Sequence, residues 1–121
     1  MAIQTDAQRN NLAAAYGAAA AYGALYTTPP GASAGSEPSG GAPAYARKPL
    51  TWGAPANGVV TATATFDVPI GTTVVGTGLH TAVSGGTYLD GGLLRDGNGN
   101  PITQPFSSQG TYTATFTYTQ S

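Results

Sequence analysis

Residues 111–119 read TYTATFTYT, with a threonine at every odd position and Tyr112, Ala114, Phe116 and Tyr118 at the even positions. Because successive side chains of a strand point to opposite faces, this alternation predicts a strand that turns its even positions toward a core. Residues 59–68, VVTATATFDV, alternate in the same way. We predict that these two strands are partners and present their threonines side by side on one face. Such an uncharged face suits a surface covered by a neighbouring subunit better than one left in water, where Lys or Glu would be expected.

Other segments of the chain predict further short strands separated by glycine- and proline-rich turns. The candidate strands are residues 24–31, 72–82, 87–94 and 102–106. Residues 95–101, RDGNGNP, consist of turn-forming residues and predict a hairpin tip. Many short strands of this kind predict a mainly β fold, an antiparallel β-sandwich or jelly-roll-like barrel.

One helix is expected, near the N-terminus. The stretch Thr5-Asp6-Ala7-Gln8 fits a capping box, and the alanine-rich residues after it favour a helix from 6 to about 22, with Gly23 as a left-handed stop. We therefore expect an N-terminal helical arm at residues 1–23 and a β-sandwich domain at residues 24–121. The helix either docks on the sheet or serves as an assembly arm. Residues 29–44, rich in Gly, Pro and Ser, predict a long loop.

Composition restricts the classes of function. Only 7% of the 121 residues are charged and the net charge is −1, against about 25% charged residues in ordinary soluble domains. We therefore expect no nucleic-acid partner and no membrane partner, because a basic surface is lacking. The absence of cysteine excludes disulfides and thiolate metal sites. No secretory signal is evident at the start, so assembly in the cytoplasm of the producing cell is expected.

No constellation of residues predicts catalysis, so we expect a protein that is not an enzyme and uses no cofactor and no metal. The one histidine, His80, is predicted to be a packed or rim residue of a strand. Asp67, Asp90 and Asp96 lie in or near different turns and do not form a general acid–base pair. Asp96 begins a DGNGN stretch that matches half of a calcium loop, but a tight hairpin explains it better, because Pro101 and Ser107 stand where the loop requires Gly and Glu.

Two groups of side chains allow two interpretations each. The rings of Tyr45, Trp52, Tyr88 and Tyr112 fill either a small core or an exposed sugar-stacking platform. The only basic pair, Arg47-Lys48, is either a solvated corner or an ion-pair contact to an acidic partner such as a capsid subunit.

The order of several motifs along the chain resembles a known family. The segments are ALYTTPPG (24–31), GGAPAYARKPLTWG (40–53) and FDVPIGTTVVGTGLHTAVSGGTYLDGGLL (66–94), followed by the threonine-rich last strand. Together they resemble small structural proteins from tailed phages of actinobacteria, which are capsid-decorating, minor tail or tail-fibre-like proteins. The chain departs from that pattern at residues 26–30 and at His80, where tryptophan is common.

The resemblance implies a virion component, and we expect a capsid decoration (cementing) protein that binds and stabilises the assembled shell. The alternative is a minor tail or tail-fibre-like protein, with or without a carbohydrate- or receptor-binding role. Expected partners are further copies of the chain in a homotrimer and the major capsid protein or other virion subunits; the expected location is the capsid surface, alternatively the tail. The candidate interface residues are Leu12, Tyr16, Arg47, Lys48, Trp52, His80, Thr113, Thr115 and Thr117.

Overall fold

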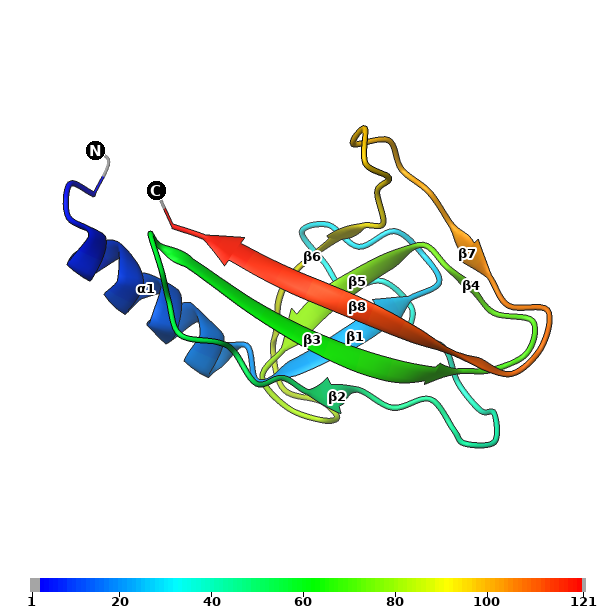
Figure 1. The fold of residues 1–121 in the computed structure, drawn as a ribbon. Coiled ribbons are helices and arrows are strands. Elements are labelled where there is room, and N and C mark those ends of the chain that lie inside the picture. Colours follow the sequence, from blue (N-terminus) through cyan, green and yellow to red (C-terminus); the bar gives the residue numbers. More distant parts are fainter. Residues whose placement is uncertain (1–2, 121) are drawn as a thin grey trace.

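The computed structural model describes residues 3–120, which form one helix and antiparallel strands (Figure 1). The mainly β fold with a helix near the N-terminus is therefore confirmed. The elements are α1 (Asp6–Ala19), β1 (Tyr22–Tyr26), β2 (Lys48–Pro49), β3 (Val59–Val68), β4 (Thr73–Val74), β5 (Gly76–His80), β6 (Tyr88–Leu93), β7 (Gln104–Pro105) and β8 (Gly110–Thr119).

The helix begins where the capping sequence predicts and ends earlier than expected. The Thr5 side chain accepts a hydrogen bond from the Gln8 N–H at 3.3 Å, so Thr5 is the N-cap. The helix ends at Ala19, and the prediction that Gly23 is its left-handed stop is wrong, because Gly23 lies in β1. A side chain at Gly23 would meet the ring of Phe116 at 2.9 Å, so glycine is needed there for close packing of the strand on the core.

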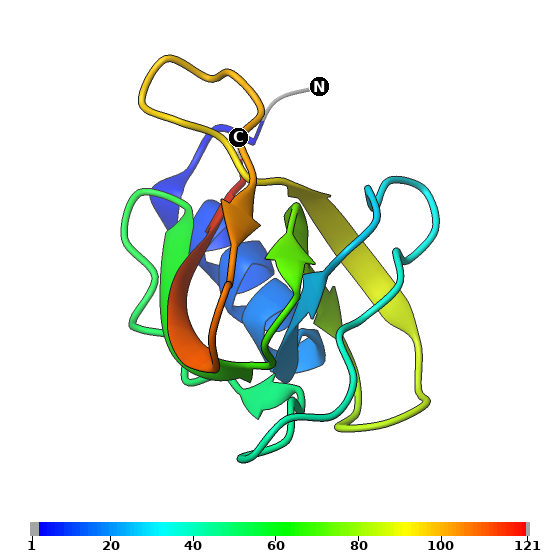
Figure 2. The ribbon, with the colours of Figure 1, turned by 90° about the vertical axis from the view of Figure 1, so that its right-hand side faces the viewer.

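The described residues form three sheets, and the two larger ones enclose the core. One has four strands in the order β2-β1-β5-β6, and the other is the long β3–β8 ribbon. Figure 2 shows the ribbon on one side and the four-stranded sheet on the other, with α1 behind them. The pairing of β3 with β8 is confirmed and runs from Val59 opposite Thr119 to Val68 opposite Gly110. The predicted strand 72–82 is two strands, β4 and β5, and β4 pairs with β7.

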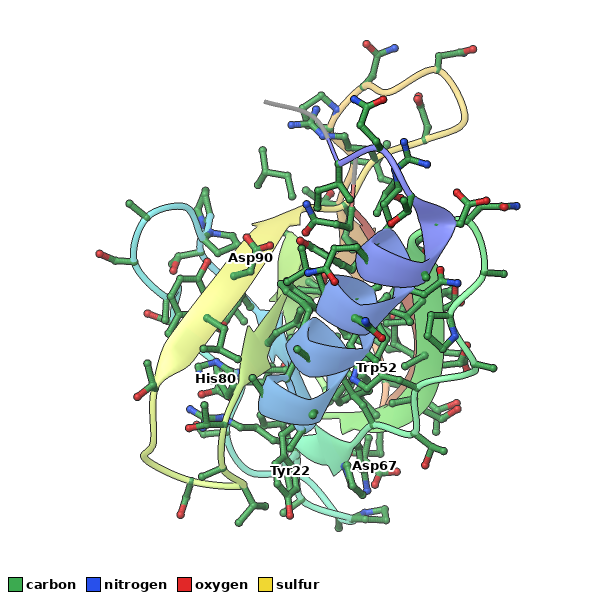
Figure 3. All side chains as sticks on the ribbon, turned by 90° about the vertical axis from the view of Figure 1, so that its left-hand side faces the viewer. Tyr22, Trp52, Asp67, His80 and Asp90 are labelled. Carbon is green, nitrogen blue, oxygen red and sulfur yellow. The ribbon has the colours of Figure 1, made fainter. Side chains whose placement is uncertain are left out.

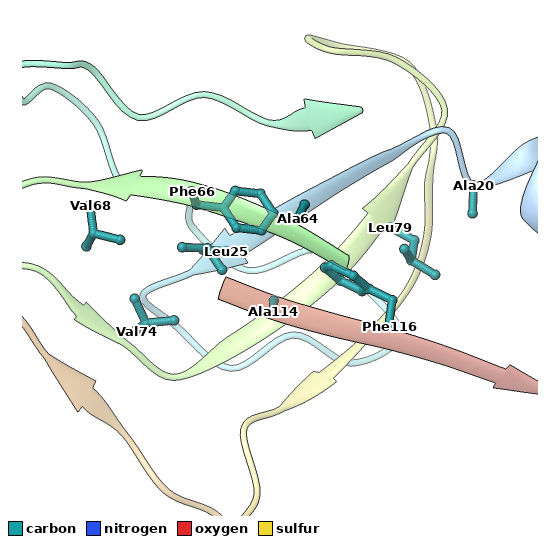
Figure 4. Packing of buried hydrophobic residues seen from close by; sticks show 9 residues of the cluster. All are labelled: Ala20, Leu25, Ala64, Phe66, Val68, Val74, Leu79, Ala114 and Phe116. Atoms are coloured by element: carbon teal, nitrogen blue, oxygen red, sulfur yellow. The ribbon is translucent and has the colours of Figure 1, made fainter. Parts of the chain in front are cut away.

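The core lies between the two sheets (Figure 4). Phe66 and Phe116 from the ribbon pack against Leu25 of β1 and Leu79 of β5. Ala20, just after the helix, is fully buried in the same cluster. The even positions of β8 therefore face the core as the alternation predicts, with Ala114 and Phe116 buried and Tyr112 packed against the cluster.

The long loop after β1 covers the outer face of the four-stranded sheet. Both Ala24 and Tyr26 have no exposed surface, although they point away from the core between the sheets. The loop is held by the Thr27 N–H, which donates to the Ser36 carbonyl at 2.7 Å, and by the Tyr88 hydroxyl, which donates to the Gly31 carbonyl at 2.8 Å. The loop therefore covers a second, smaller packed layer on this face of the sheet.

Candidate functional site

The most extended regular surface is the outer face of the β3–β8 ribbon, which we call the threonine face. Its cross-strand pairs are Thr61 with Thr117, Thr63 with Thr115 and Thr65 with Thr113, and all six side chains are exposed. The hydroxyls of Thr65 and Thr113 lie 2.9 Å apart and those of Thr63 and Thr115 lie 3.4 Å apart, so each pair shares a hydrogen bond.

Backbone geometry explains why these threonines reach each other. Gln120 N–H donates to the Gly58 carbonyl, and the register then makes every second pair along the ribbon a hydrogen-bonded pair. The threonine pairs are the alternate, non-hydrogen-bonded pairs, in which opposite side chains lie closest. The hydrogen bonds between threonine side chains thus follow from the strand register. They connect the two strands on a face where Asp67 is the first charged residue of β3.

Tyr16 and Trp52 come together where α1 crosses the end of the ribbon. The Tyr16 ring stacks on Tyr118 with centroids 3.7 Å apart, and its edge meets Trp52 at 6.3 Å. The Trp52 indole N–H donates to the Ala20 carbonyl at 2.8 Å, and the Tyr16 hydroxyl donates to Asp90 at 3.0 Å. Figure 3 shows Trp52 and Asp90 on opposite sides of the helix. These two candidate residues fasten α1 to both sheets.

Leu12 is the candidate residue that extends from α1 into solvent. It is 38% exposed. Its place on the helix leaves it available to a neighbour, unlike the buried Ala13 and Gly17 of the same helix.

Arg47 is engaged within the chain. Its Nη2 lies 2.8 Å from the Glu37 carboxylate, its Nε also donates to Glu37, and its Nη1 donates to the carbonyls of Ala82 and Gly85 at 3.0 Å. Tyr45 donates to the same carboxylate at 2.8 Å and accepts from the Leu25 N–H. Burial by itself raises the pKa of the Glu37 carboxyl, but the hydrogen bonds from Arg47 and Tyr45 outweigh it and lower that pKa below its ordinary value.

This cluster ties the loop 27–47 to the turn after β5. Sequence reasoning singled out Arg47 but not Glu37, because an isolated glutamate in a Gly/Pro/Ser-rich loop gives no periodic signal. The scarcity of charged residues could have indicated the Glu37–Arg47 ion pair, because the few opposite charges within one loop are candidates for pairing. An open hollow of about 310 Å³ lies beside the cluster, between Glu37, Tyr45, Arg47 and Ser84.

Lys48 lies beside Arg47 in sequence but points elsewhere. Its ammonium is 3.6 Å from Asp67 of β3, and both side chains are partly exposed. Arg47 and Lys48 therefore do not form a shared basic patch, and each is paired with a different acid.

His80 lies in the layer beneath the loop and is 3% exposed. Its Nε2 shares a hydrogen bond with the Tyr26 hydroxyl, and its ring also lies against Tyr88 at 5.6 Å. Burial, with a smaller contribution from Arg47, lowers the pKa of the imidazole. Both the His80 ring and the Tyr26 side chain to which it bonds are buried, so the placement of His80 is that of a packed residue, as predicted.

The other groups considered from sequence have structural surroundings too. Tyr45, Trp52 and Tyr112 pack against the core and Tyr88 against the layer beneath the loop, so these rings do not form one exposed platform. Asp96 accepts hydrogen bonds from the N–H groups of Asn98 and Asn100, which closes the hairpin tip. Among residues 3–120, no three His, Asp or Glu side chains are grouped as metal ligands, and no helix is long and apolar enough to cross a membrane.

A second hollow, of about 240 Å³, lies between β6 and β8. It is lined by Tyr16, Asp90, Gly92 and the β8 residues from Thr115 to Tyr118. None of the sequence patterns pointed to it, because it is formed by the ends of two different sheets.

Comparison with known proteins gives one match. Residues 5–104 match the model of a family described as Podophage GP4 fiber I protein gp80. No curated protein matches the chain, and no solved structure matches it.

Proposed function

Because the chain belongs to the family described as Podophage GP4 fiber I protein gp80, a family of phage fibre proteins, we propose that it is a non-enzymatic subunit of a fibre on a phage particle. The match over residues 5–104, which takes in α1 and most of the β structure, is the observation that carries this proposal. The function is binding: the subunit occupies its place by burying surface against its neighbours, and no reaction is turned over.

The threonine face is the surface we assign to contact with a second copy of the chain. Three properties support this role: it is extended, it is uncharged over the paired threonines, and its hydroxyl pairs hold it in one geometry. A closed homotrimer would cover such a face on each copy. Threonine side chains also lose less conformational entropy on contact than the long charged side chains that usually guard a free sheet.

A position on the capsid shell is the second candidate. These 121 residues contain no fibre-type repeats, which suits a compact decorating module that contacts the major capsid protein. The same threonine face and the exposed Leu12 would then meet the shell.

Direct imaging of purified particles tests these positions. A tag placed after residue 120 and labelled with gold is expected on the fibres next to the tail. Label spread evenly over the shell would support the decoration role instead, and particles that lack the protein altogether would contradict both. The matched control is a particle carrying the untagged chain.

A further inference from the structure

The strands β6 and β8 are the end strands of their sheets, and they face each other across the 240 Å³ hollow described above. In Figure 2 the red β8 and the yellow β6 stand apart, with α1 behind them. No hydrogen bond joins β6 to β8 among the described residues. This seam therefore leaves two strand edges unpaired.

The register shows which groups of β8 point into the seam. Pairs such as Ala62 with Phe116 are hydrogen-bonded across the ribbon, so the N–H and C=O groups of Thr113, Thr115 and Thr117 point away from β3. The Thr61 carbonyl on β3 points outward in the same sense and accepts from the Gly53 N–H, which supports this assignment. The described residues provide no partner for the outward backbone groups of Thr115 and Thr117.

The edge of β6 is built from the same alternation. The Leu25 N–H donates to Tyr45, away from β5, so the backbone groups of Ala24 and Tyr26 are the ones that bond to β5. The alternate residues of β5, Thr77 and Leu79, therefore bond to β6. Gly91 and Leu93 therefore point their backbone groups outward. The Gly91 N–H is capped by the Asp90 side chain at 2.8 Å, which leaves the Gly91 carbonyl as an acceptor on this edge.

The seam is closed at one end and open along the rest. Tyr16 bridges it by donating to Asp90 of β6 while stacking on Tyr118 of β8. Beyond this bridge the floor is apolar, formed by Leu79 and Phe116, and the position of Gly92 is open because a side chain there would meet nothing within 4 Å. The groove runs along β8 from Thr115 to Tyr118, a length of about 10–13 Å in an extended chain.

We propose that this groove binds an extended segment of another polypeptide, of three to four residues, which adds a strand to the outer edge of β8 and completes the seam toward β6. An extended backbone presents N–H and C=O groups at the spacing that the two edges require. Small side chains fit inward above Leu79 and Phe116, and a basic residue fits next to Asp90, the one charged side chain in the groove lining.

A partner polypeptide suits the groove better than a second copy of the chain. The extended segments of residues 3–120 are all held in sheets or in the pinned loop, so a second copy could offer only its β8 with β3 attached. In addition, β8 carries none of the lysines, prolines or bulges that usually protect an exposed edge. The inference does not depend on where the subunit lies in the particle.

Peptide titration of the ¹⁵N-labelled full chain tests the proposal. The probe is the hexapeptide Lys-Ala-Thr-Ala-Thr-Ala, acetylated and amidated, and its matched control carries N-methyl groups at alternate residues. We expect a dissociation constant in the range of about 0.1–1 mM for the probe and binding weakened about tenfold or more for the N-methylated control. Amide exchange at Thr115 and Thr117 should slow on binding, while the exchange of Ala114 and Phe116, already bonded to β3, should stay unchanged.

Two variants separate edge pairing from side-chain effects. Thr115→Pro removes the outward N–H without removing a backbone hydrogen bond to β3 and is expected to abolish probe binding. Thr115→Val loses the same side-chain hydroxyl bond to Thr63 but keeps the N–H, and it should bind as the original chain does. Three outcomes would overturn the proposal. They are equal binding of both peptides, chemical-shift changes confined to the outer threonine side chains, and no binding at a probe concentration of about 5 mM, which is five times the weakest dissociation constant expected. Self-association of the chain that Thr115→Pro alone abolishes would also overturn the proposal, since a second copy would then occupy the edge.

Discussion

Arg47 and Glu37 are the residues in which the scarcity of charge in this chain has its clearest consequence. A guanidinium with five hydrogen bonds, two of them to backbone carbonyls, holds together a loop and a turn that are distant in sequence. Lys48, its neighbour, makes one longer ion pair near the surface. Two adjacent basic residues thus differ in what they contribute to stability.

Arg47→Met is expected to destabilise the fold by about 2–4 kcal/mol, because it leaves the partly buried Glu37 carboxylate without its counter-charge. Urea unfolding followed by Trp52 fluorescence measures the change. Lys48→Met is the matched control and should cost less than about 1 kcal/mol, as surface pairs usually do. Equal losses in the two variants would contradict the central role of Arg47.

His80 gives the fold a dependence on pH. Burial lowers the imidazole pKa in the folded state. As the pH falls below the ordinary histidine pKa, the unfolded chain therefore binds a proton more readily than the folded chain does. Stability is therefore complete above about pH 6.5 and falls as the pH drops through that value, by at most about 1.4 kcal/mol per pH unit. The groups that face the ring are Tyr26, Tyr88, Glu37 and Arg47.

His80→Gln should remove this dependence between pH 7 and 5, because glutamine can still bond to Tyr26 but does not titrate there. Equilibrium unfolding at several pH values measures it. The loss that remains below about pH 4.5 belongs in part to Glu37, whose lowered pKa makes its contribution disappear only under more acidic conditions. A variant that keeps the full slope between pH 7 and 5 would contradict the assignment to His80.

At the scale of elements, α1 shows how packing can override helix propensity. Gly17 lies in the last turn of the helix, where alanine would still be the better helix former. A side chain there, however, would meet the Trp52 ring at 2.9 Å. The glycine therefore costs some local helix stability and allows close contact between the helix and Trp52.

Gly17→Ala is accordingly expected to lower stability by about 1–2 kcal/mol, and to shift the emission of Trp52, the only tryptophan, because the indole must move. Thermal unfolding and fluorescence spectra measure the two effects. Gly97→Ala, in the open hairpin tip, is the control and should leave the emission unchanged. A more stable Gly17→Ala variant would show that the helix is free to shift away from Trp52.

The element predictions succeeded where the pattern is local. Alternation over ten residues specified β3, β8 and their shared threonine face, because period two is incompatible with a helix that buries one stripe. The element predictions failed at Gly23, predicted as the helix stop, and at Val75, predicted to lie within one strand. At both positions contacts with distant residues determine the backbone conformation. The Val75 N–H, for instance, donates to Tyr26 of β1, and this contact separates β4 from β5.

At the scale of the whole molecule, the low charge leaves association controlled by shape and hydrogen bonding. With a net charge of −1, copies of the chain repel each other little, so the threonine face is free to meet another copy. Charge placed on this face should therefore act on assembly far more than on folding.

The double variant Thr61→Lys/Thr63→Lys is expected to convert the proposed homotrimer to a monomer while changing stability by less than about 1 kcal/mol. Light scattering over a range of concentrations measures the assembly, and both positions lie on β3, away from the groove between β6 and β8. Ser33→Lys/Ser39→Lys, in the exposed loop, is the control. An original chain that stays monomeric at high concentration would contradict the trimer.

The sequence by itself determined the class of fold, the start of the helix, the pairing of the two long strands and the uncharged face that they share. These features rest on short-range periodicity and on composition, which any segment carries with it. Only the tertiary structure decided that Arg47 turns inward to Glu37, that His80 is covered by the loop, and that β6 and β8 leave an open seam. The reason is that each of these features depends on how segments tens of residues apart are brought together. The free energy of such long-range contacts cannot be deduced from the spacing of residues within any one segment.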